Sequence, residues 1–271
     1  MADIDVLETH LASMGRVLLG YSGGVDSAVL AVAGRRALGP GRFLAVIGRS
    51  ASYPEVQYRT AVELAERFGI PLLEVDTHEL DDPRYAANPT NRCYFCKNEL
   101  WTRLGAVAAE RGFDVIVDGT NADDLGEHRP GLQAAEERRV RSPFAELGWT
   151  KAMVREAGRT LGLPTWDAPA APCLASRVTY GLAVTPERLR QVERAEAWLR
   201  ELGVRGDLRV RHHGERARIE ASPEAFELLR GAWAAVEAAF RDTGFEAVEL
   251  DPRGYRRGSL LTVLDTPAPA R

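Results

Sequence analysis

Short apolar strands alternate with helices along the first half of the chain, and this alternation restricts the fold more than any other feature. A β-α-β-α order with short apolar strands favours a parallel sheet that is covered by helices on both faces. Such sheets bind ligands at the carboxyl ends of their strands. The pattern predicts strands at 16–21, 43–48, 71–76 and 114–118, and helices at 26–38, 54–68, 93–111 and 150–161.

The second half predicts a separate and smaller α+β domain. The segment after Leu163 contains Pro164, Pro169 and Pro172, so it cannot be one continuous helix and reads as a linker. Beyond it the pattern predicts helices at 186–202 and 223–243, and strands at 208–212, 217–221 and 245–250. The expected organisation is an α/β domain over 1–165, a linker over 166–180, a small domain over 181–265 and a frayed tail over 266–271.

Charge and hydropathy exclude several classes of protein. The 35 basic and 39 acidic side chains give a formal net charge of −4, which argues against a chain that mainly grips nucleic acid. The apolar runs are much shorter than the roughly 20 residues that a membrane-spanning helix needs. The acidic start of the chain lacks the apolar region of a secretory signal, so we expect a cytoplasmic protein without a membrane partner.

The loop Ser22-Gly23-Gly24-Val25-Asp26-Ser27 follows a predicted strand and opens a predicted helix. Adjacent glycines let a backbone approach a phosphate closely, and a helix N-terminus offers unpaired N–H donors. The two serine hydroxyls add further donors. The loop has no lysine, so it is not a Walker loop. It resembles the pyrophosphate loop of the ATP pyrophosphatases, which split ATP into AMP and pyrophosphate; the alternative is an ordinary turn that caps a helix.

A second polar loop, 118–124, follows the last predicted strand of the first domain. Its carboxylates would repel a pyrophosphate unless they hold a cation, so we expect Asp123 to anchor Mg²⁺. Arg129 can neutralise a phosphate or a substrate carboxylate. Alternatively, Asp123 or Asp124 caps the next helix.

Three cysteines stand in two segments. Cys93 and Cys96 form a C-x-x-C motif at a predicted helix start, and Cys173 lies in the proline-rich linker. Basic neighbours and the helix dipole favour thiolates here. Three thiolates suit a [4Fe–4S] cluster with one open iron that could carry an extra sulfide. The alternatives are zinc with a fourth ligand from a histidine, a redox-active dithiol, or structural cysteines; the candidate histidines are His78, His128, His212 and His213.

Five segments together resemble the LarE family of ATP-dependent sulfur transferases, which make the nickel-pincer nucleotide cofactor of lactate racemase. The segments are GYSGGVDSA, NPTNRCYFCK, DGTNADDLGEHRPG, APCLASR and RVRHHG. The resemblance covers roughly residues 5–263 and implies a PP-loop α/β domain followed by a small α+β domain. It also implies a nucleotide substrate, pyridinium-3,5-biscarboxylic acid mononucleotide, whose carboxylates are adenylated with ATP and then converted to thiocarboxylates.

The resemblance assigns roles to the cysteines and to several charged residues. Some members sacrifice the sulfur of a cysteine at the position of Cys173, while others also have cysteines at the positions of Cys93 and Cys96 and bind a [4Fe–4S] cluster. This chain resembles the second branch, which makes all three cysteines catalytic. The resemblance further implies that Arg177, Arg209 and Arg211 bind the substrate, that Glu196 lines the sulfur site, and that the chain forms a homo-oligomer such as a hexamer and works with other enzymes of the nickel-pincer pathway.

The residues themselves leave these roles open. Arg209 and Arg211 alternate along one predicted strand face, where two cations repel each other unless an anion lies between them, but a solvated charged strand fits equally. Glu196 could be a surface acid. His212 and His213 fit ordinary strand residues, and Trp101 fits a buried helix position.

Other functions use the same loop. A tRNA thiolation enzyme combines a pyrophosphate loop with a cluster, but the net charge and the lack of an added RNA-binding module argue against it. An amide-forming synthetase would leave the cysteines unexplained. A nucleotide-binding sensor would hold ATP without turnover.

Overall fold

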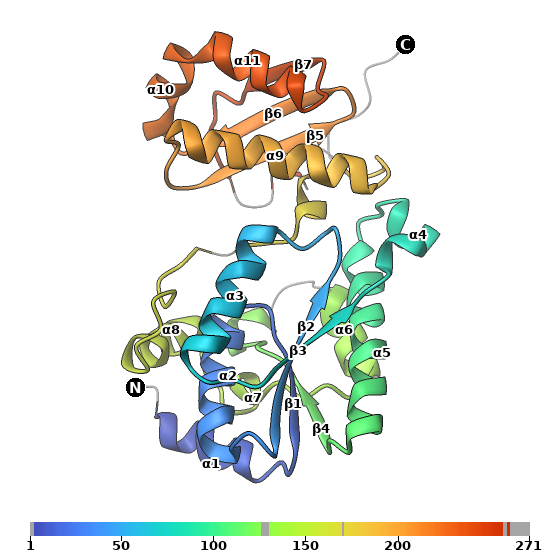
Figure 1. The fold of residues 1–271 in the computed structure, drawn as a ribbon, viewed down its shortest axis with the longest axis vertical. Coiled ribbons are helices and arrows are strands. Elements are labelled where there is room, and N and C mark those ends of the chain that lie inside the picture. The colour runs from blue at the N-terminus through green and yellow to red at the C-terminus, as the bar shows by residue number, and fades with distance from the viewer. Residues whose placement is uncertain (1–2, 126–129, 170, 257–258, 261–271) are drawn as a thin grey trace. The chain divides into compact units, whose positions relative to one another are not determined.

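The computed structural model describes residues 3–125, 130–169, 171–256 and 259–260. It divides the chain into two compact units, one made of residues 1–85 and 91–171 and the other of residues 86–90 and 172–271. The chain therefore leaves the first unit for five residues, returns at Asn91, and crosses again at Pro172. Figure 1 shows both units as ribbons.

The first unit is built on a parallel sheet in the order β3-β2-β1-β4, as the alternation predicts. The strands are β1 (Val17–Gly20), β2 (Phe43–Arg49), β3 (Leu72–Asp76) and β4 (Val115–Val117). The main helices are α1 (Ile4–Ala12), α2 (Val25–Leu38), α3 (Glu55–Arg67), α5 (Arg92–Arg111), α6 (Pro130–Glu137) and α8 (Lys151–Thr160). Shorter elements are η1 (Glu79–Asp81), α4 (Pro83–Ala86), η2 (Ala122–Asp124) and α7 (Pro143–Glu146).

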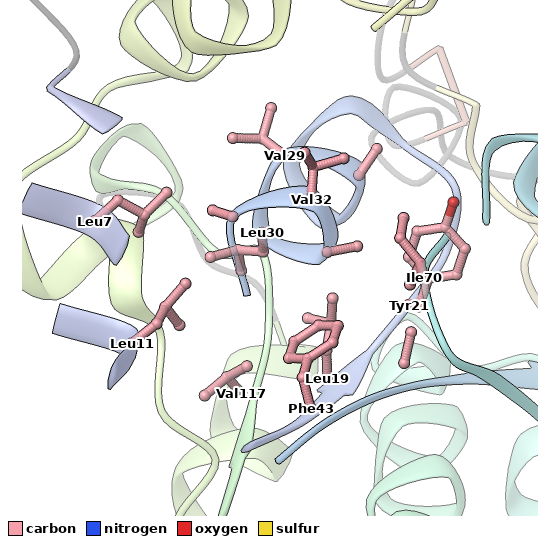
Figure 2. Packing of buried hydrophobic residues seen from close by; sticks show 14 of the residues in the cluster. Leu7, Leu11, Leu19, Tyr21, Val29, Leu30, Val32, Phe43, Ile70 and Val117 are labelled. Carbon is pink, nitrogen blue, oxygen red and sulfur yellow. The ribbon is translucent and has the colours of Figure 1, made fainter. Parts of the chain in front are cut away.

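Side chains that alternate along β1 and β2 enter two different cores, because successive residues of a strand point to opposite faces. Leu19 and Phe43 pack with α1, α2, α3, α7 and α8 on one face, where Figure 2 shows part of the cluster. Leu18 and Leu44 pack with α5 and α6 on the other face. Helices thus cover both faces, and the loops after β1 and β4 emerge at neighbouring carboxyl ends of the sheet.

The second unit contains a small sheet in the order β5-β6-β7, in which β5 and β6 are antiparallel and β6 and β7 parallel. Its elements are η3 (Leu174–Arg177), α9 (Pro186–Leu202), β5 (Leu208–His213), β6 (Arg216–Ala221), η4 (Pro223–Ala225), α10 (Phe226–Gly231), α11 (Trp233–Asp242) and β7 (Ala247–Leu250). Apolar residues of β5 and β6, such as Val210 and Ile219, pack against α9 and α11. The alternate positions, including Arg209, Arg211 and Glu220, therefore belong to the opposite, polar face of the sheet.

One predicted helix is wrong as a continuous element. The segment predicted as a helix over 223–243 consists of η4, α10 and α11, with a break at Ala232 beside Gly231. Glycine inside a helix costs about 1 kcal/mol relative to alanine, which favours a break at this point. The predicted tail over 266–271 lies outside the described residues. Among the helices of the described ranges, none combines the length and the apolar character that crossing a membrane requires.

Candidate active site

The loop between β1 and α2 has the geometry of a phosphate cradle. Gly23 has a φ of +67°, and a Cβ at this position would lie 2.5 Å from the Cβ of Ala61 on α3. Only glycine meets both demands without strain. Gly24 is the N-cap of α2 in an extended conformation and has no side chain to cap the helix, so the N–H groups of its first turn point into the loop.

Hydroxyl groups hold this loop in one shape. The Ser27 hydroxyl donates to the Gly24 carbonyl at 3.1 Å and accepts from the Ser22 N–H at 3.2 Å. Tyr53 and Gln57 donate to the Ser22 carbonyl at 2.9 and 3.0 Å. Burial raises the pKa of Tyr53 well above its ordinary value, which keeps this hydroxyl protonated as a donor.

The second loop lies directly against the first. A Cβ at Gly119 would approach the Asp26 Cβ to 2.9 Å and the Ser27 N to 3.0 Å, so glycine permits this close contact. Asn121 is 2% exposed, and its side-chain amide N–H donates to Asp26 at 3.4 Å. The two predicted loops therefore form one site at the carboxyl ends of β1 and β4.

A lysine that sequence reasoning missed completes this site. The Lys151 ammonium group, in the first turn of α8, forms an ion pair with the Asp26 carboxylate. The Lys151 backbone N–H donates to Asp123 Oδ2 at 2.9 Å. The loop itself contains no lysine, but the Lys151 side chain, 125 residues from Asp26 in the sequence, places an ammonium group beside it. The signal that could have revealed it is weak: Thr150 is a helix N-cap that places the next residue at a helix start.

The acidic residues of the second loop have local roles as well. Asp124 accepts from the Asn121 N–H at 3.2 Å in a capping box, and Asn121 Oδ1 accepts from the Asp123 N–H at 3.0 Å. Arg129, predicted to neutralise an anion, lies outside the described residues, as does His128.

Cys93 and Cys96 lie in the first turns of α5, in the first unit. Residues three apart on a helix are neighbours on its surface, so both thiols belong to one side of α5. Cys93 is exposed and Cys96 partly exposed, and both are thiols rather than disulfide partners. Trp101, further along α5, is buried as predicted, with the Lys97 ammonium 5.1 Å from its ring centre.

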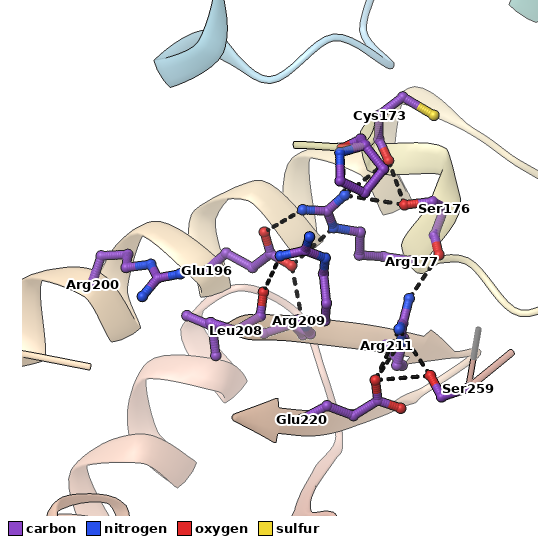
Figure 3. A network of polar contacts seen from close by, with 12 residues as sticks. Cys173, Ser176, Arg177, Glu196, Arg200, Leu208, Arg209, Arg211, Glu220 and Ser259 are labelled. Atoms are coloured by element: carbon purple, nitrogen blue, oxygen red, sulfur yellow. Dashed lines mark hydrogen bonds and ion pairs between the residues drawn. The ribbon is translucent and has the colours of Figure 1, made fainter. Parts of the chain in front are cut away.

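Cys173 belongs to the second unit and immediately precedes η3. Its carbonyl accepts from the Ser176 hydroxyl at 2.7 Å and from Arg177 Nη1 at 3.0 Å. Arg177 Nη1 also donates to the Pro172 carbonyl at 2.6 Å. Figure 3 shows the Cys173 sulfur projecting away from these donors. The backbone is therefore fixed while the partly exposed thiol points elsewhere.

Arg209 and Arg211 lie on the polar face of the small sheet, and Arg177 of η3 and Glu196 of α9 join them in one polar network (Figure 3). Arg177 pairs with Glu196, which also accepts from the Val210 N–H at 3.0 Å. Arg211 pairs with Glu220 at 2.9 Å, and Ser259 bridges the two residues.

Arg209 lies on the same face, stacked over the ring of Tyr255. Burial, followed by the positive charge of Arg177, lowers the pKa of Arg209 below its ordinary value. Both predicted strand histidines, His212 and His213, lie in β5.

Within each unit, no three His, Cys, Asp or Glu side chains of the described residues gather closely enough to hold a metal ion. Cys93 and Cys96 belong to one unit and Cys173 to the other, so a centre built on all three draws on both.

Comparisons with known proteins identify the family of the chain. A family model described as NAD synthase matches residues 4–106, which include the loop between β1 and α2. The chain is 32% identical to the pyridinium-3,5-bisthiocarboxylic acid mononucleotide synthase of Lactiplantibacillus plantarum, over 95% of this chain and 93% of that protein. It is 42% identical to an uncharacterised protein of Synechocystis sp., over 96% and 97% of the two chains. It is 29% identical to an uncharacterised protein of Methanocaldococcus jannaschii, over 89% and 91%. With its pyrophosphate-type loop, parallel sheet and near full-length similarity to the L. plantarum enzyme, the chain belongs to the LarE family of PP-loop, ATP-dependent sulfurtransferases.

Proposed function

We propose that this chain converts the carboxylates of pyridinium-3,5-biscarboxylic acid mononucleotide to thiocarboxylates, with release of AMP and pyrophosphate. The similarity to the L. plantarum synthase over 93% of its length supports the substrate. The observation that carries the reaction type is the cradle of residues 22–27, with Lys151 paired to Asp26 beside it.

In the first step a substrate carboxylate oxygen attacks the α-phosphorus of ATP, and the bond to the pyrophosphate oxygen breaks. A carboxylate is ionised at neutral pH, so this attack needs no general base. The protein must position two anions and neutralise the charge on the leaving pyrophosphate. The N–H groups at the start of α2 and the Lys151 ammonium group are the donors for this task.

Mg²⁺ fits this site as a partner of the phosphates. It is bound in proteins by one or two carboxylates together with water and substrate phosphates, so it needs no cage of several acids. Asp26 and Asp123 are the carboxylates that would hold it, and both bond to Lys151 in this structure. When ATP and Mg²⁺ bind, one of these two carboxylates would then give up its bond to Lys151 and bind Mg²⁺ instead.

The three thiols fit an iron–sulfur centre by their chemistry. Thiolates are the usual ligands of such clusters, and two cysteines within the first turns of one helix match the common local spacing. Cys93, Cys96 and Cys173 would hold a [4Fe–4S] cluster, which when bound supplies an extra sulfide for transfer to the adenylated carboxylate. AMP is the group that this substitution releases.

We call Arg177, Arg209 and Arg211, together with Glu196 and Glu220, the arginine face. It is the proposed site for the anionic groups of the nucleotide substrate. Arg177, Arg209 and Arg211 carry three positive charges, against two negative charges on Glu196 and Glu220. The excess positive charge of this largely buried group favours an anion beside it.

The test is turnover by the anaerobically purified protein with ATP, Mg²⁺ and the biscarboxylate nucleotide. We expect substrate-dependent pyrophosphate release and a product whose mass shows oxygen replaced by sulfur. Pyrophosphate release without any sulfur-containing product, under iron and sulfide supply, would contradict the proposed transfer. The Asp26→Asn variant should lose the pyrophosphate release that the wild type shows. A protein that only binds ATP as a sensor would release no pyrophosphate, either as wild type or as this variant.

Iron, acid-labile sulfide and zinc assays on the same preparation test the centre. We expect iron and sulfide, and loss of repeated turnover in the Cys93→Ala/Cys96→Ala double variant. A colourless protein with stoichiometric zinc would contradict the cluster. Loss of one sulfur from Cys173 after a single turnover would instead support the sacrificial route.

A further inference from the structure

The loops that follow β1, β2 and β3 are bonded to one another in series inside the first unit. These strands are parallel neighbours in the sheet, so the loops at their carboxyl ends emerge side by side. The loop after β1 is the cradle of residues 22–27. The loop after β2 forms a turn over residues 50–53, and the loop after β3 runs into η1, which begins at Glu79.

Glu79 carries a carboxylate in the interior of this edge of the sheet. It is 3% exposed, and its Oε1 accepts from the Ser50 hydroxyl at 2.5 Å. Its Oε2 is also buried, and no group among the described residues forms a hydrogen bond with it. A buried carboxylate with one partnered oxygen lowers stability relative to a well-packed apolar residue, so packing alone does not explain Glu79.

The bond from Ser50 to Glu79 fixes the turn after β2. The same Ser50 hydroxyl accepts from the Ser52 N–H at 3.2 Å, and the Ser50 carbonyl accepts from the Tyr53 N–H at 3.1 Å. The Ser52 and Tyr85 hydroxyls lie 2.8 Å apart, and both side chains are buried. The turn is therefore held through two of its side chains as well as through its own backbone.

This turn delivers the Tyr53 hydroxyl to the phosphate cradle. The hydroxyl donates to the Ser22 carbonyl at 2.9 Å. The Ser22 carbonyl and the Gly23 N–H belong to one planar trans peptide group, in which they point in opposite directions. A donor that holds the carbonyl therefore also orients the Gly23 N–H, which is one of the backbone donors of the cradle.

We propose that Glu79 is a positioning residue for ATP binding. Acting through Ser50 and Tyr53, it holds the cradle peptide after Ser22 in the orientation that receives a phosphate. The inference rests on the proposed function only in taking the cradle as the phosphate site, and it requires no contact between Glu79 and ATP.

The test measures the dissociation constant of ATP with Mg²⁺ for the full-length protein by isothermal titration calorimetry. Glu79→Leu removes the acceptor for the Ser50 hydroxyl and should weaken binding about fivefold, the size expected from the loss of one hydrogen bond. Glu79→Gln keeps an acceptor at this position and should bind within about twofold of the wild type. This rescue separates the hydrogen bond from the mere presence of a large side chain.

A double-mutant cycle tests whether Glu79 acts through Tyr53. Tyr53→Phe removes the last bond of the series and should also weaken binding about fivefold. Because the two residues act in series, the double variant should bind about as weakly as either single variant, whereas independent effects would multiply to about 25-fold. The matched control is Tyr58→Phe, since the Tyr58 hydroxyl donates to Glu74 and not to the cradle. It should bind ATP as the wild type does, and Glu79→Leu/Tyr58→Phe should bind as Glu79→Leu does.

Thermal unfolding without ATP confirms that each variant is folded. If Glu79→Leu does not fold, Ser50→Ala takes its place, because it interrupts the same series at the next residue. We expect the same loss of ATP affinity and the same absence of a further loss when it is combined with Tyr53→Phe.

Three outcomes would overturn the inference. They are wild-type affinity in the Glu79→Leu or Ser50→Ala variant that is measured, equal losses in Glu79→Gln and Glu79→Leu, and losses that multiply when either variant is combined with Tyr53→Phe. All three leave the cradle in place as the ATP site. A wild-type protein that binds no ATP would instead remove the cradle, and with it both this inference and the proposed adenylation.

Discussion

The Arg177 guanidinium group and the Glu196 carboxylate form a two-armed ion pair, in which the Nε–Oε1 and Nη2–Oε2 distances are both 3.0 Å. The third nitrogen of Arg177 holds the carbonyls of Pro172 and Cys173. The pair therefore connects α9 to the backbone that carries the Cys173 thiol. In this structure Arg177 fixes the backbone of the cysteine segment.

Arg177→Met should destabilise the protein by about 3–5 kcal/mol, because it leaves the Glu196 carboxylate in a mostly buried position without this partner. Urea unfolding measures the loss, and the rate of Cys173 alkylation should change because its carbonyl loses a donor. The control is Arg190→Met, which removes an exposed ion pair with Glu187 and should cost less than about 1 kcal/mol. Equal costs for the two variants would show that the Arg177 pair does not stabilise the segment.

The sequence predicts the first unit well because its signals are local. The alternation of strands and helices, the glycines of residues 22–27 and the proline-rich segment all act within a few residues, and the parallel sheet follows from them. The sequence pattern does not predict the short helices α1, α6 and α7, because each is too short to show a sustained helical repeat of apolar residues.

The parts of the site that the sequence does not predict depend on tertiary contacts. Nothing near Lys151 marks it as the partner of Asp26, because the pair forms only when α8 packs beside α2. Likewise, Asn88 precedes a proline and reads as loop, while the carbonyl groups that its buried amide binds lie about 90 residues away. The sequence also does not show that Arg209 and Arg211 are buried. Their alternation with apolar residues fits equally a strand whose charged side is exposed to solvent.

Lys151→Ala should lower the rate of substrate-dependent pyrophosphate release by about 100-fold or more. Loss of a single charged or polar group that stabilises a developing anion has an effect of this size. Lys151→Arg should retain more activity because it keeps the charge. Arg159→Ala, an exposed change on the same helix, is the control and should be silent. An unchanged rate in Lys151→Ala would exclude the lysine from the phosphate site.

Stability should decrease as the pH falls from about 6.5 towards 4, because of His212. Burial, then the charges of Arg188 and His213, lower the pKa of His212 from 6.5 to about 4 in the folded chain. Below pH 6.5 the unfolded chain binds this proton and the folded chain does not, so acid favours unfolding. The shift, 6.5 − 4 = 2.5, corresponds to a loss of about 3 kcal/mol once the pH is below both values.

Urea unfolding across this pH range in wild type and His212→Asn measures the effect, which should flatten in the variant. His78→Gln, at a half-exposed position, should retain the wild-type slope. An identical slope in His212→Asn would assign the acid sensitivity to other groups.

The adjacent glycines of the loop should respond differently to alanine. A Cβ at Gly23 would lie 2.5 Å from the Ala61 Cβ and 2.9 Å from its Cα, at a φ of +67°, so neither the backbone nor the neighbour can accommodate it cheaply. We expect Gly23→Ala to lower stability by about 1–3 kcal/mol and to weaken ATP binding.

At Gly24 the nearest atom to a new Cβ is the Ser22 hydroxyl oxygen at 3.6 Å, an ordinary contact. Gly24→Ala should therefore keep the melting temperature of the wild type and weaken ATP binding alone, since its methyl group enters the space where the backbone meets phosphate. Thermal unfolding with and without ATP separates the two effects, and a Gly24→Ala variant that binds ATP normally would remove this part of the loop from the phosphate site.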